Sequence, residues 1–505
     1  MSVGPSVGII GAGFGGLAAA LELKAAGIDS FAVLERGAEV GGVWQANTYP
    51  GAACDVPSVI YQFSRHLKPN WSRRFGLQAE IRDYLREVSR ETGVREHIRF
   101  HAEVVAASFD EREAVWRVEI ADGETLTFDV LICATGQLSR PRLPELTGSE
   151  SFQGAQFHSA QWDHSVELAG RRVVVVGGGA SAIQVVPAIV DAAEHLTVVQ
   201  RSPSWVVGKH DWTPSRLERQ ITRRFPALLS LYHHAMWWWF ESRYPLVLRR
   251  MDPLRRVWEA HLRRSIRKVV KDPAKAAAAT PDYALGCNRL LLSSEWYQTI
   301  ARPDVDLIRA GVTAMTPTGI VTSEGEEIEA DVVVWCTGFT ATEYLAPIHI
   351  TGRGGLDIRE AWADGPEAYL GLATAGFPNM FMSYGPNTGS LTNTLVSMVE
   401  YQASYMRQAI EYVAREDVAL DIRQEVHSAF VAETEERLRK TVFTSGCPGW
   451  YTTDSGRVTT VWFGSHVEYR RRTRTFDPAV YEQLPRHPAA TAGLDTAPLG
   501  EASLR

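Results

Sequence analysis

The sequence predicts an α/β protein that contains two βαβ units, and three observations support this fold class. An apolar strand at 7–10 is followed by a glycine-rich turn, a helical segment at 17–26 and a second strand at 30–34. The same order of elements returns at 172–200, about 166 residues further along, which indicates two domains of one type rather than a tandem array. Apolar residues make up 45% of the chain and charged residues 22%, which is typical of a folded globular protein.

The length of 505 residues is enough for two to four domains of about 150 residues each. Residues from about 210 to 285 are rich in Arg, Leu and Trp at helical spacing, so we expect a helical insertion there. The Ala- and Pro-rich residues 485–505 are expected to form a disordered tail.

Shorter apolar runs predict the remaining strands. Asp122-Gly123 separates the runs at 118–120 and 126–128, which predicts a β-hairpin. Further strands are expected at 130–133, 305–307, 319–322 and 332–335.

Charge and cysteine usage exclude several kinds of protein. The 52 basic and 59 acidic residues leave a formal net charge of −7, which gives no reason to expect nucleic-acid binding. The five cysteines are scattered without a C-x-x-C pair, which argues against a disulfide framework, a zinc site and a redox-active dithiol, and fits a reducing cytosol. His233-His234 lacks the spacing of metal ligands, so no metal is expected.

Two uncharged stretches could be mistaken for membrane segments. No basic region precedes the stretch at 1–21, so it does not match a signal peptide. The stretch at 173–190 contains Gly177-Gly178-Gly179 and Pro187, which suit a strand, a turn and a helix better than a lipid-facing helix. We therefore expect no integral membrane segment and a cytoplasmic location.

Gly11-Ala12-Gly13-Phe14-Gly15-Gly16 forms a G-x-G-x-x-G turn directly after the first strand. The first glycine permits the tight turn, the second lets the backbone approach a pyrophosphate, and the third packs the helix on the strand. The N-terminus of the helix then faces the phosphates. Glu35 follows the second strand. A carboxylate at this position accepts a hydrogen bond from the ribose hydroxyl of an adenosine that has no 2′-phosphate. These residues predict a Rossmann-like site for FAD or NAD.

Gly177-Gly178-Gly179-Ala180-Ser181-Ala182 repeats this pattern with alanine in the last position. The residue 24 positions after the first glycine is Glu35 in the first unit and Arg201 in the second. An arginine there suits a 2′-phosphate, so the second site is predicted to bind NADP. The alternative for Arg201 is a solvated charge at the end of a strand.

Two dinucleotide sites in one chain indicate hydride transfer between two cofactors. Thiol–disulfide reductases with this layout need a nearby cysteine pair, which the sequence lacks. Dioxygen is then the simplest electron acceptor.

One segment resembles the fingerprint of the Baeyer–Villiger monooxygenases, F-x-G-x-x-x-H-x-x-x-W followed by Pro or Asp. It is formed by Phe152, Gly154, His158, Trp162 and Asp163, just before the second glycine turn, where that family has it. Related flavin-containing monooxygenases usually have Tyr or Phe at the position of Trp162. Further matches extend over about residues 5–480 and include the segments 41–44, 49–55, 134–136, 331–339, 385–389 and 463–477.

The resemblance implies FAD and NADPH as cofactors, each in its own Rossmann-like domain. The FAD domain would comprise 1–150 and 342–484, and the NADPH domain, 151–341, would be inserted between these two parts. The resemblance also implies roles for individual residues. The catalytic pair would be Arg289 and Asp55. The residues implied at the FAD site are Gly11, Gly13, Phe14, Gly16, Glu35, Val43, Trp44, Asp55, Tyr61 and Val104. The residues implied at the NADP site are Gly177, Gly179, Ser181, Ala182, Gln184, Arg201 and Ser202. His158 would lie in a linker between the domains and act through domain positioning.

The resemblance also implies the reaction. NADPH would reduce the flavin, the reduced flavin would capture O2 as a C4a-peroxide, and the peroxide would attack a ketone to give an ester or lactone. Oxidation of sulfur or nitrogen compounds is the alternative activity, and Arg289 and Trp162 argue against it as the main one. A nucleotide-binding flavoprotein without turnover is a more remote alternative, because Asp55 and Arg289 are both retained.

The chain departs from the pattern of this family at two positions. Asn288 stands where a lysine that reaches the 2′-phosphate is frequent, so a preference for NADPH would depend on Arg201. Ala53 stands where an arginine is frequent, which removes one contact on the nicotinamide side.

Trp237-Trp238-Trp239-Phe240 lies in the expected helical insertion, beside Arg243, Arg249 and Arg250. A membrane-surface patch is one interpretation of this segment. A helical core with flanking charges is the interpretation that we favour from the sequence.

Overall fold

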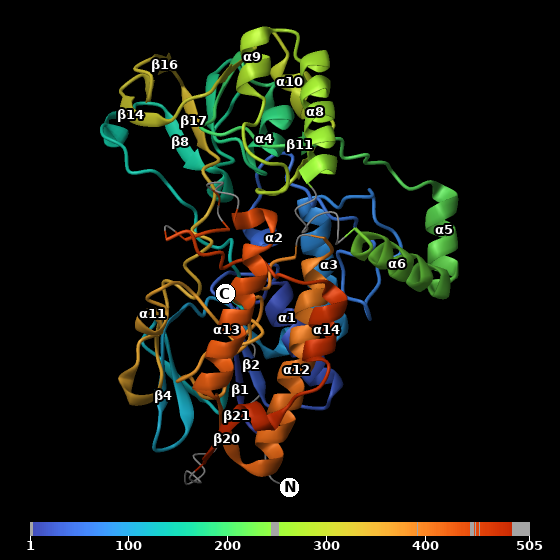
Figure 1. Ribbon diagram of the computed structural model, residues 1–505, viewed down its shortest axis with the longest axis vertical. Coiled ribbons are helices and arrows are strands. Elements are labelled where there is room, and N and C mark those ends of the chain that lie inside the picture. Colours follow the sequence, from blue (N-terminus) through green and yellow to red (C-terminus); the bar gives the residue numbers. More distant parts are fainter. Residues whose placement is uncertain are drawn as a thin grey trace, which may run out of the picture.

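The computed structural model describes residues 4–243, 252–390, 392–444, 449, 451–453 and 455–486. In Figure 1 the chain forms two α/β bodies, one above the other, with the helices α5 and α6 projecting to one side. Of the tail expected at 485–505, Pro485 instead ends a β-strand and Arg486 is also described, while the remainder lies outside the described residues.

The first body is built on a parallel sheet of five strands with β1 at its centre. Across the sheet, the strands are β19 (Met380–Met382), β7 (Val130–Cys133), β1 (Val7–Ile10), β2 (Phe31–Leu34) and β3 (Ile98–Arg99). The edge strand β19 follows the second body in sequence, so the chain returns to the first sheet after forming the second one. The helices of this body are α1 (Phe14–Ala25), α2 (Val43–Ala46), α3 (Gln78–Glu91), α11 (Ile358–Ala361), α12 (Leu395–Glu416), α13 (Gln424–Arg439) and α14 (His466–Thr473).

The helix α1 is mostly apolar because it is covered on two sides. It packs between the first sheet and the long helix α12. Small side chains at Ala18, Ala19 and Ala20 are buried there and allow a close approach. This packing fixes the start of α1, which the glycine-rich turn connects to β1.

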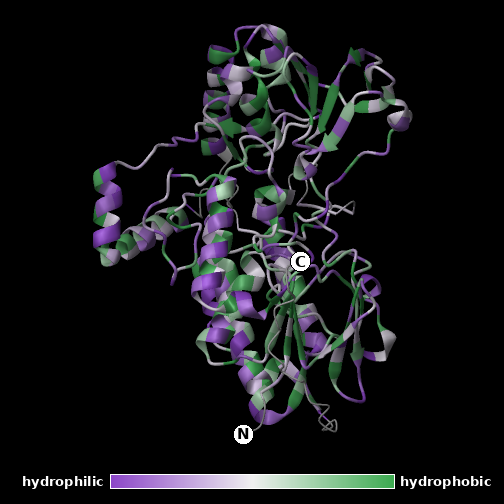
Figure 2. Cartoon of the chain, turned by 180° about the vertical axis from the view of Figure 1, so that it is seen from behind, coloured by the Kyte–Doolittle hydropathy of each residue, from purple (hydrophilic) through white to green (hydrophobic). Residues whose placement is uncertain are grey.

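The second body is built on another parallel sheet of five strands, rich in valine and covered on both faces. In order they are β13 (Val305–Ile308), β10 (His195–Val199), β9 (Arg172–Val176), β17 (Val332–Trp335) and β8 (Ala155–His158). Its helices are α4 (Ala182–Ile189), α8 (Asp252–Val269), α9 (Pro273–Ala278) and α10 (Trp296–Ile300). Figure 2 shows the strands of both central sheets largely in the hydrophobic colour.

Smaller sheets complete both bodies. The predicted hairpin is confirmed, since β5 and β6 pair antiparallel with Val118 opposite Leu126. One sheet of four strands contains β4 (Val104–Asp110), β5 (Val115–Ile120), β6 (Thr125–Phe128) and β18 (His349–Thr351). A sheet of three strands contains β14 (Val312–Thr316), β15 (Gly319–Thr322) and β16 (Glu327–Glu329). Two further sheets have two strands each, β11 (Val206–Val207) with β12 (Leu291–Leu292), and β20 (Val418–Ile422) with β21 (Tyr481–Pro485).

The expected helical insertion is present, but its two halves belong to different bodies. Helices α8 and α9 pack into the core of the second body. Helices α5 (Arg216–Arg224) and α6 (Pro226–Glu241) reach the first body instead, where α6 packs on Val59 and Ile60. The segment 237–240 was expected to be part of a helical core. It is helical, but only Trp237 is buried, whereas Trp238 and Trp239 are 57% and 62% exposed.

The cysteines differ from expectation at one position. Cys287 is disulfide-bonded, so the cysteine pattern no longer argues for a reducing compartment. Cys54, Cys133 and Cys336 are free and buried. Within the described ranges, no helix is long and apolar enough to cross a bilayer, and no group of three or more potential ligands is arranged to hold a metal ion.

Candidate active site

The first glycine-rich turn joins β1 to α1 at the carboxyl edge of the first sheet. Gly11 has a φ of +100°, and a Cβ there would lie 2.7 Å from the carbonyl oxygen of Ala134. A Cβ at Gly16 would collide with the carbonyl of Gly11. Helix α1 starts after Gly13 with no side-chain cap and no acidic residue in its first turn, so its first N–H groups are available to a phosphate.

Glu35 directly follows β2, and the backbone fixes its carboxylate above this turn. The carboxylate accepts hydrogen bonds from Ala12 N at 2.7 Å and from Gly37 N at 2.8 Å. Ser383 Oγ lies beside Gly15 of the same turn and is buried with no hydrogen-bond partner in the protein. A fixed carboxylate, an uncapped helix and an unpaired hydroxyl fit the ribose and pyrophosphate of FAD.

The aromatic residues implied at the flavin gather beside the turn. Trp44 in α2 donates its indole N–H to the hydroxyl of Tyr61 at 3.1 Å, and their rings meet edge-on. The ring of Phe14 lies 5.1 Å from that of Tyr61. Val43 begins α2. Val104 begins β4 and is buried in the same core cluster as Leu34, the residue before Glu35. The structure thus brings these sequence-predicted residues together at one edge of the sheet.

The second glycine-rich turn joins β9 to α4. Gly177 has a φ of +136°, and a Cβ there would collide with the carbonyl of Cys336. A Cβ at Gly179 would meet nothing within 4 Å, so the space above this glycine is open. Ser181 and Ala182 lie at the N-terminus of α4, which has no side-chain cap and no acidic residue in its first turn. This end of the helix can therefore receive a second pyrophosphate.

The same backbone hydrogen bond closes both turns. Gly11 N donates to the carbonyl of Leu34 at 2.8 Å, and Gly177 N donates to the carbonyl of Val199 at 2.8 Å. The ends of β2 and β10 are therefore equivalent in the two sites.

Glu35 follows that carbonyl in the first site, and Gln200 follows it in the second. The expectation that Arg201 takes the position of Glu35 is wrong by one residue, because the second unit has one residue fewer between its turn and its second strand. Gln200 replaces the carboxylate with a neutral amide, whose buried Oε1 lies at Gly178 and has no hydrogen-bond partner in the protein. Arg201 and Ser202 come next and are exposed.

The side chain of Gln184 connects the two bodies. Its Oε1 accepts hydrogen bonds from the hydroxyl of Tyr49 at 2.9 Å and from Ala53 N at 3.3 Å, and its Nε2 donates to Ala53 O at 2.9 Å. Gly51 has a φ of +81°, and a Cβ there would lie 2.5 Å from the carbonyl of Gln184. Gln184 thus holds α4 against the segment that leads to Asp55, and its predicted contact with NADP stays a prediction.

Arg289 and Asp55 form a two-point ion pair between the bodies. Arg289 donates from Nε to Oδ2 at 2.9 Å and from Nη2 to Oδ1 at 2.7 Å. Arg289 precedes β12 on the side of the second body, whereas Asp55 belongs to the first body. The pair is partly accessible, with 36% of the arginine side chain and 23% of the aspartate side chain exposed. The negative charge of Asp55 raises the pKa of Arg289 further, so the guanidinium stays charged.

Three residues around this pair were not singled out from the sequence. Burial raises the pKa of both Tyr384 and Tyr451, and the charge of Arg289 opposes that shift in each. Burial lowers the pKa of Lys209, although Asp211 and Asp55 oppose the shift. Tyr384 directly precedes the 385–389 motif, and that position was the signal that could have found it.

The fingerprint residues lie at the edge of the second sheet. His158 ends β8, which pairs with β17, rather than lying in a free linker. It is 1% exposed, its Nδ1 accepts from Ala160 N at 3.0 Å, and its ring meets that of Phe339 in the segment that returns to the first body. Phe152 packs against the core of the second body, and Gly154 lies against the carbonyl of Asp331. The ring of Trp162 meets that of Phe157 edge-on. Asp163 is exposed, and its carboxylate accepts a hydrogen bond from Ser165 N.

The two departures from the family pattern have clear places in the structure. Asn288 shares a hydrogen bond with Tyr283. Ala53 uses its backbone N–H and carbonyl to hold Gln184.

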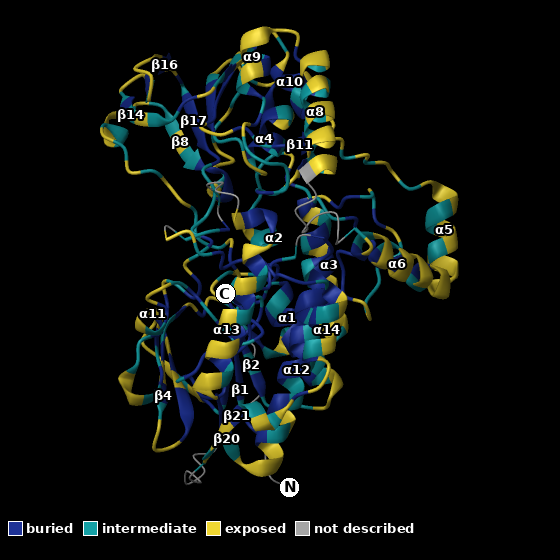
Figure 3. Cartoon of the chain, in the orientation of Figure 1, coloured by how far each residue is buried: buried dark blue, intermediate teal, exposed yellow. Residues whose placement is uncertain are grey.

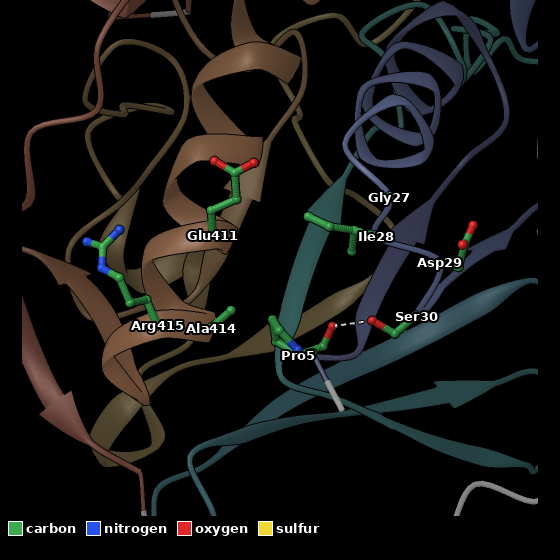
Figure 4. A pocket seen from close by; sticks show the side chains of 9 residues that line it. Pro5, Gly27, Ile28, Asp29, Ser30, Glu411, Ala414 and Arg415 are labelled. Carbon is green, nitrogen blue, oxygen red and sulfur yellow. Dashed lines mark hydrogen bonds between the residues drawn. The ribbon is translucent and has the colours of Figure 1, made fainter. Parts of the chain in front are cut away.

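A surface pocket in the first body is unrelated to this site (Figure 4). Pro5, Ile28, Asp29, Glu411 and Arg415 are among the residues that line it. It lies at the amino ends of β1 and β2, whereas the glycine-rich turn and Glu35 lie at the carboxyl ends. Dinucleotides bind at the carboxyl ends of parallel strands, so this pocket is not the candidate site.

Comparison with known proteins identifies the family. A family profile described as pyridine nucleotide-disulphide oxidoreductase matches residues 8–235, which include both glycine-rich turns. A Baeyer–Villiger monooxygenase of Streptomyces coelicolor is 41% identical over 510 residues, which cover 98% of each chain. The chain belongs to the Baeyer–Villiger monooxygenases.

Solved structures agree with this assignment. A crystal structure of OTEMO in complex with FAD and NADP resembles this Baeyer–Villiger monooxygenase with a TM-score of 0.85 and 28% identity, covering 94% of this chain and 98% of that one. An oxidised steroid monooxygenase bound to NADP matches with a TM-score of 0.84 and 30% identity, covering 95% and 99%. The predicted fold class, with two dinucleotide-binding sheets, is confirmed, and so is the resemblance seen in the fingerprint. The roles of the individual site residues stay predictions.

Proposed function

We propose that this Baeyer–Villiger monooxygenase uses NADPH and O2 to insert one oxygen atom beside the carbonyl group of a ketone. One atom of O2 enters the ester or lactone, the other leaves as water, and NADPH with one proton supplies the two electrons and two hydrogens. FAD bound at the first glycine-rich turn supplies the chemistry that activates O2. The ion pair of Asp55 and Arg289 is the observation that carries the proposal.

Arg289 has the donors that this reaction needs. A guanidinium has five N–H groups, and Asp55 takes two of them, which leaves three for a substrate or cofactor oxygen. Attack on a ketone carbonyl places negative charge on its oxygen, and a fixed cation stabilises that charge. Because the pKa of Arg289 is raised, the residue provides this charge at any pH at which the protein is folded. Arg289 thus acts as a hydrogen-bond donor to the developing oxyanion and does not act as an acid.

Asp55 acts by holding Arg289. Two charge-assisted hydrogen bonds orient the guanidinium plane, and the half-buried Tyr384 and the buried Tyr451 beside it limit the access of water. Since Asp55 and Arg289 lie on different bodies, the pair forms only when the two bodies are closed on each other. The FAD side and the NADPH side are therefore both needed to assemble this site.

The second glycine-rich turn would take NADPH. Its helix N-terminus suits the pyrophosphate, and the neutral Gln200 removes the carboxylate that would repel a 2′-phosphate. The exposed Arg201 next to it supplies a cation for that phosphate. A cytoplasmic location is part of the proposal, because the reaction consumes NADPH, but the cysteine pattern no longer supports it.

Oxygen uptake and product analysis test the proposal. The purified yellow protein is given NADPH with cyclic, aryl, long-chain and steroid ketones, and with sulfides, and the products are analysed by mass spectrometry. We expect NADPH-dependent O2 uptake with a ketone and a product that is heavier by one oxygen atom. Formation of sulfoxides without any ester would favour the heteroatom activity instead. A colourless protein that cannot take up FAD would contradict the whole proposal.

A further inference from the structure

We propose that the outer face of α5 and α6 binds the surface of an anionic membrane. No helix described here spans a bilayer, so this would be a peripheral contact. The outer face is defined by Phe225, Leu228, Leu231, Trp238 and Trp239, together with the four arginines of α5. This inference goes beyond the proposed function and does not depend on which substrate the enzyme oxidises.

The inner face of α6 is firmly docked on the first body. Leu229, His233, Trp237 and Glu241 recur every four residues and are buried. His233 Nδ1 hydrogen-bonds the carbonyl of Val59 at 2.6 Å. The orientation of α6 is thereby fixed, and the opposite face must point outward. Figure 3 shows the exposed sides of α5 and α6 on the part that projects from the molecule.

The outer face of α6 is apolar and uncovered. Residues 225–240 contain no Asp, Glu, Lys or Arg. Phe225, Leu231, Trp238 and Trp239 are 54%, 66%, 57% and 62% exposed, respectively. A helix that is apolar all round is normally covered all round. Here only the inner half is covered by the described residues, which indicates a surface that meets an apolar phase.

The neighbouring α5 supplies positive charge. Arg216, Arg219, Arg223 and Arg224 lie on this short helix with Glu218 as its one acidic residue. None of the four arginines forms an ion pair with any part of the chain that the structure describes. Cations on one helix, with exposed tryptophans and leucines on the helix that adjoins it, are the composition of an interfacial membrane-binding segment. The cations suit anionic headgroups, and the tryptophans suit the level just below them.

The same charges argue against a second copy of the chain as the occupant. Two copies packed through this face would each place four α5 arginines at the interface, and an excess of like charge in an interface opposes association. An anionic lipid surface instead pairs with every one of these arginines. Charge complementarity therefore selects a membrane over self-association.

Vesicle sedimentation tests this proposal on the FAD-loaded full chain. One set of large vesicles contains phosphatidylcholine alone, and the other contains about 30% phosphatidylglycerol, which gives a negative surface. We expect wild type to sediment with the anionic vesicles and to remain in the supernatant with neutral ones at low salt. About 0.5 M NaCl should release it, because salt screens the arginines.

Two double variants and two matched controls locate the contact. W238S/W239S and R223E/R224E should each lower binding to the anionic vesicles by at least about tenfold. W258S removes an exposed tryptophan of α8, and R470E/R471E reverses two exposed arginines of α14, and both should bind like wild type. Bound FAD and circular dichroism show whether each variant is folded.

Three results would overturn the proposal. Wild type could fail to bind anionic vesicles, the two patch variants could bind as well as the controls, or wild type could be a dimer that W238S/W239S converts to a monomer. The last result would assign the face to a second copy. Vesicle binding is read without any ketone, so its failure is distinguishable from failure of the proposed oxidation.

Discussion

At the scale of single residues, the site depends on two charged side chains that the chain brings together from positions 234 residues apart. The family motif identified both, because Arg289 and Asp55 each lie in a recognisable segment. It could not reveal their geometry, and it gave no signal for Lys209 or Tyr451, which reach the pair through tertiary packing.

Replacement of Arg289 by alanine should lower the rate of ester formation about 100-fold or more while FAD stays bound. The physical reason is the loss of a positioned donor for the developing oxyanion, which typically costs about 3 kcal/mol. The measurement is kcat for ester formation by product analysis, with flavin absorbance as the check on FAD. Arg471→Ala, which removes an exposed arginine on α14, is the control and should leave kcat unchanged. A decrease in kcat of less than about fivefold for Arg289→Ala would mean that Arg289 is an ordinary surface charge with no part in the reaction.

The second residue-scale prediction concerns the choice between NADPH and NADH. Arg201→Ala should weaken NADPH binding about ten- to hundredfold and leave NADH almost unchanged, because only NADPH has the 2′-phosphate. Gln200→Glu should place at this strand end the same carboxylate that Glu35 provides in the first site, so it should weaken NADPH and favour NADH. Flavin reduction measured against the concentration of each cofactor gives the two dissociation constants.

Gln200→Asn keeps a neutral amide and serves as the control, with no change in the NADPH-to-NADH ratio. Equal weakening of both cofactors by Arg201→Ala would mean that Arg201 has a structural role. The residue count from the glycines could not separate Gln200 from Arg201. The structure separates them, because positions can be compared from the hydrogen bond that closes each turn, and Gln200 is then the residue equivalent to Glu35.

At the scale of elements, α4 matters as the contact between the two bodies. The sequence predicted this helix from its apolar pattern and its glycine-rich turn. It did not predict that Gln184 holds the segment 49–53, because that contact joins residues 131 to 135 positions apart. The split of the helical insertion was missed for the same reason, since helical spacing does not say which body a helix packs on.

Gly51→Ala tests this contact between elements. The new methyl group would lie 2.5 Å from the carbonyl of Gln184 and at a φ of +81°, so it should both destabilise the fold and displace α4. Gly27→Ala is a matched control, because Gly27 has a φ of +74° but nothing within 4 Å of the added methyl group. The control should cost about 1 kcal/mol from backbone strain alone.

We expect Gly51→Ala to lower Tm more than Gly27→Ala and to slow flavin reduction by NADPH, which the control should not do. Thermal unfolding and stopped-flow reduction measure the two effects. Equal losses of Tm with unchanged reduction rates would mean that the contact of Gln184 with the segment 49–53 plays no part in assembling the site.

At the scale of the whole molecule, the presence of two sheets and the order of the two domains along the chain followed from the paired βαβ units and the family motifs. The return of the chain to the first sheet through β19 and α12 was expected from the resemblance, whereas hydrophobic periodicity alone would not have given it. What the sequence could not give is the packing of long-range partners. The exposed outer face of α6 is one such feature, because the apolar residues on its two sides are alike in sequence.

Stability against pH provides a test of the packing between α12 and the loop that contains Ser64. Burial raises the pKa of Glu400 to about 7, although Ser64 donates two hydrogen bonds to its carboxylate. The unfolded chain has an ordinary glutamate pKa of about 4.3, so the folded state binds more protons between these values. The contribution of Glu400 to the free energy of unfolding is therefore fully present below about pH 4.3 and is lost as pH rises through about 7.

Glu400→Gln removes this titration. The Tm of the variant minus the Tm of wild type should increase from pH 5 to pH 8, measured by thermal unfolding with flavin fluorescence. Glu411→Gln on the exposed side of α12 is the control, and its Tm difference should be the same at both pH values. A Tm difference for Glu400→Gln that stays constant with pH would show that Glu400 is solvated and that α12 packs less closely there.

The central claim is that the Asp55–Arg289 pair directs one atom of O2 into a ketone, and isotope labelling tests it most directly. The enzyme is given NADPH, a ketone that it turns over and ¹⁸O2, and the product is analysed by mass spectrometry. We expect one ¹⁸O atom in the ester or lactone made by wild type, and almost no such product from Arg289→Ala with its FAD intact. Unlabelled product, or as much labelled ester from Arg289→Ala as from wild type, would contradict the claim.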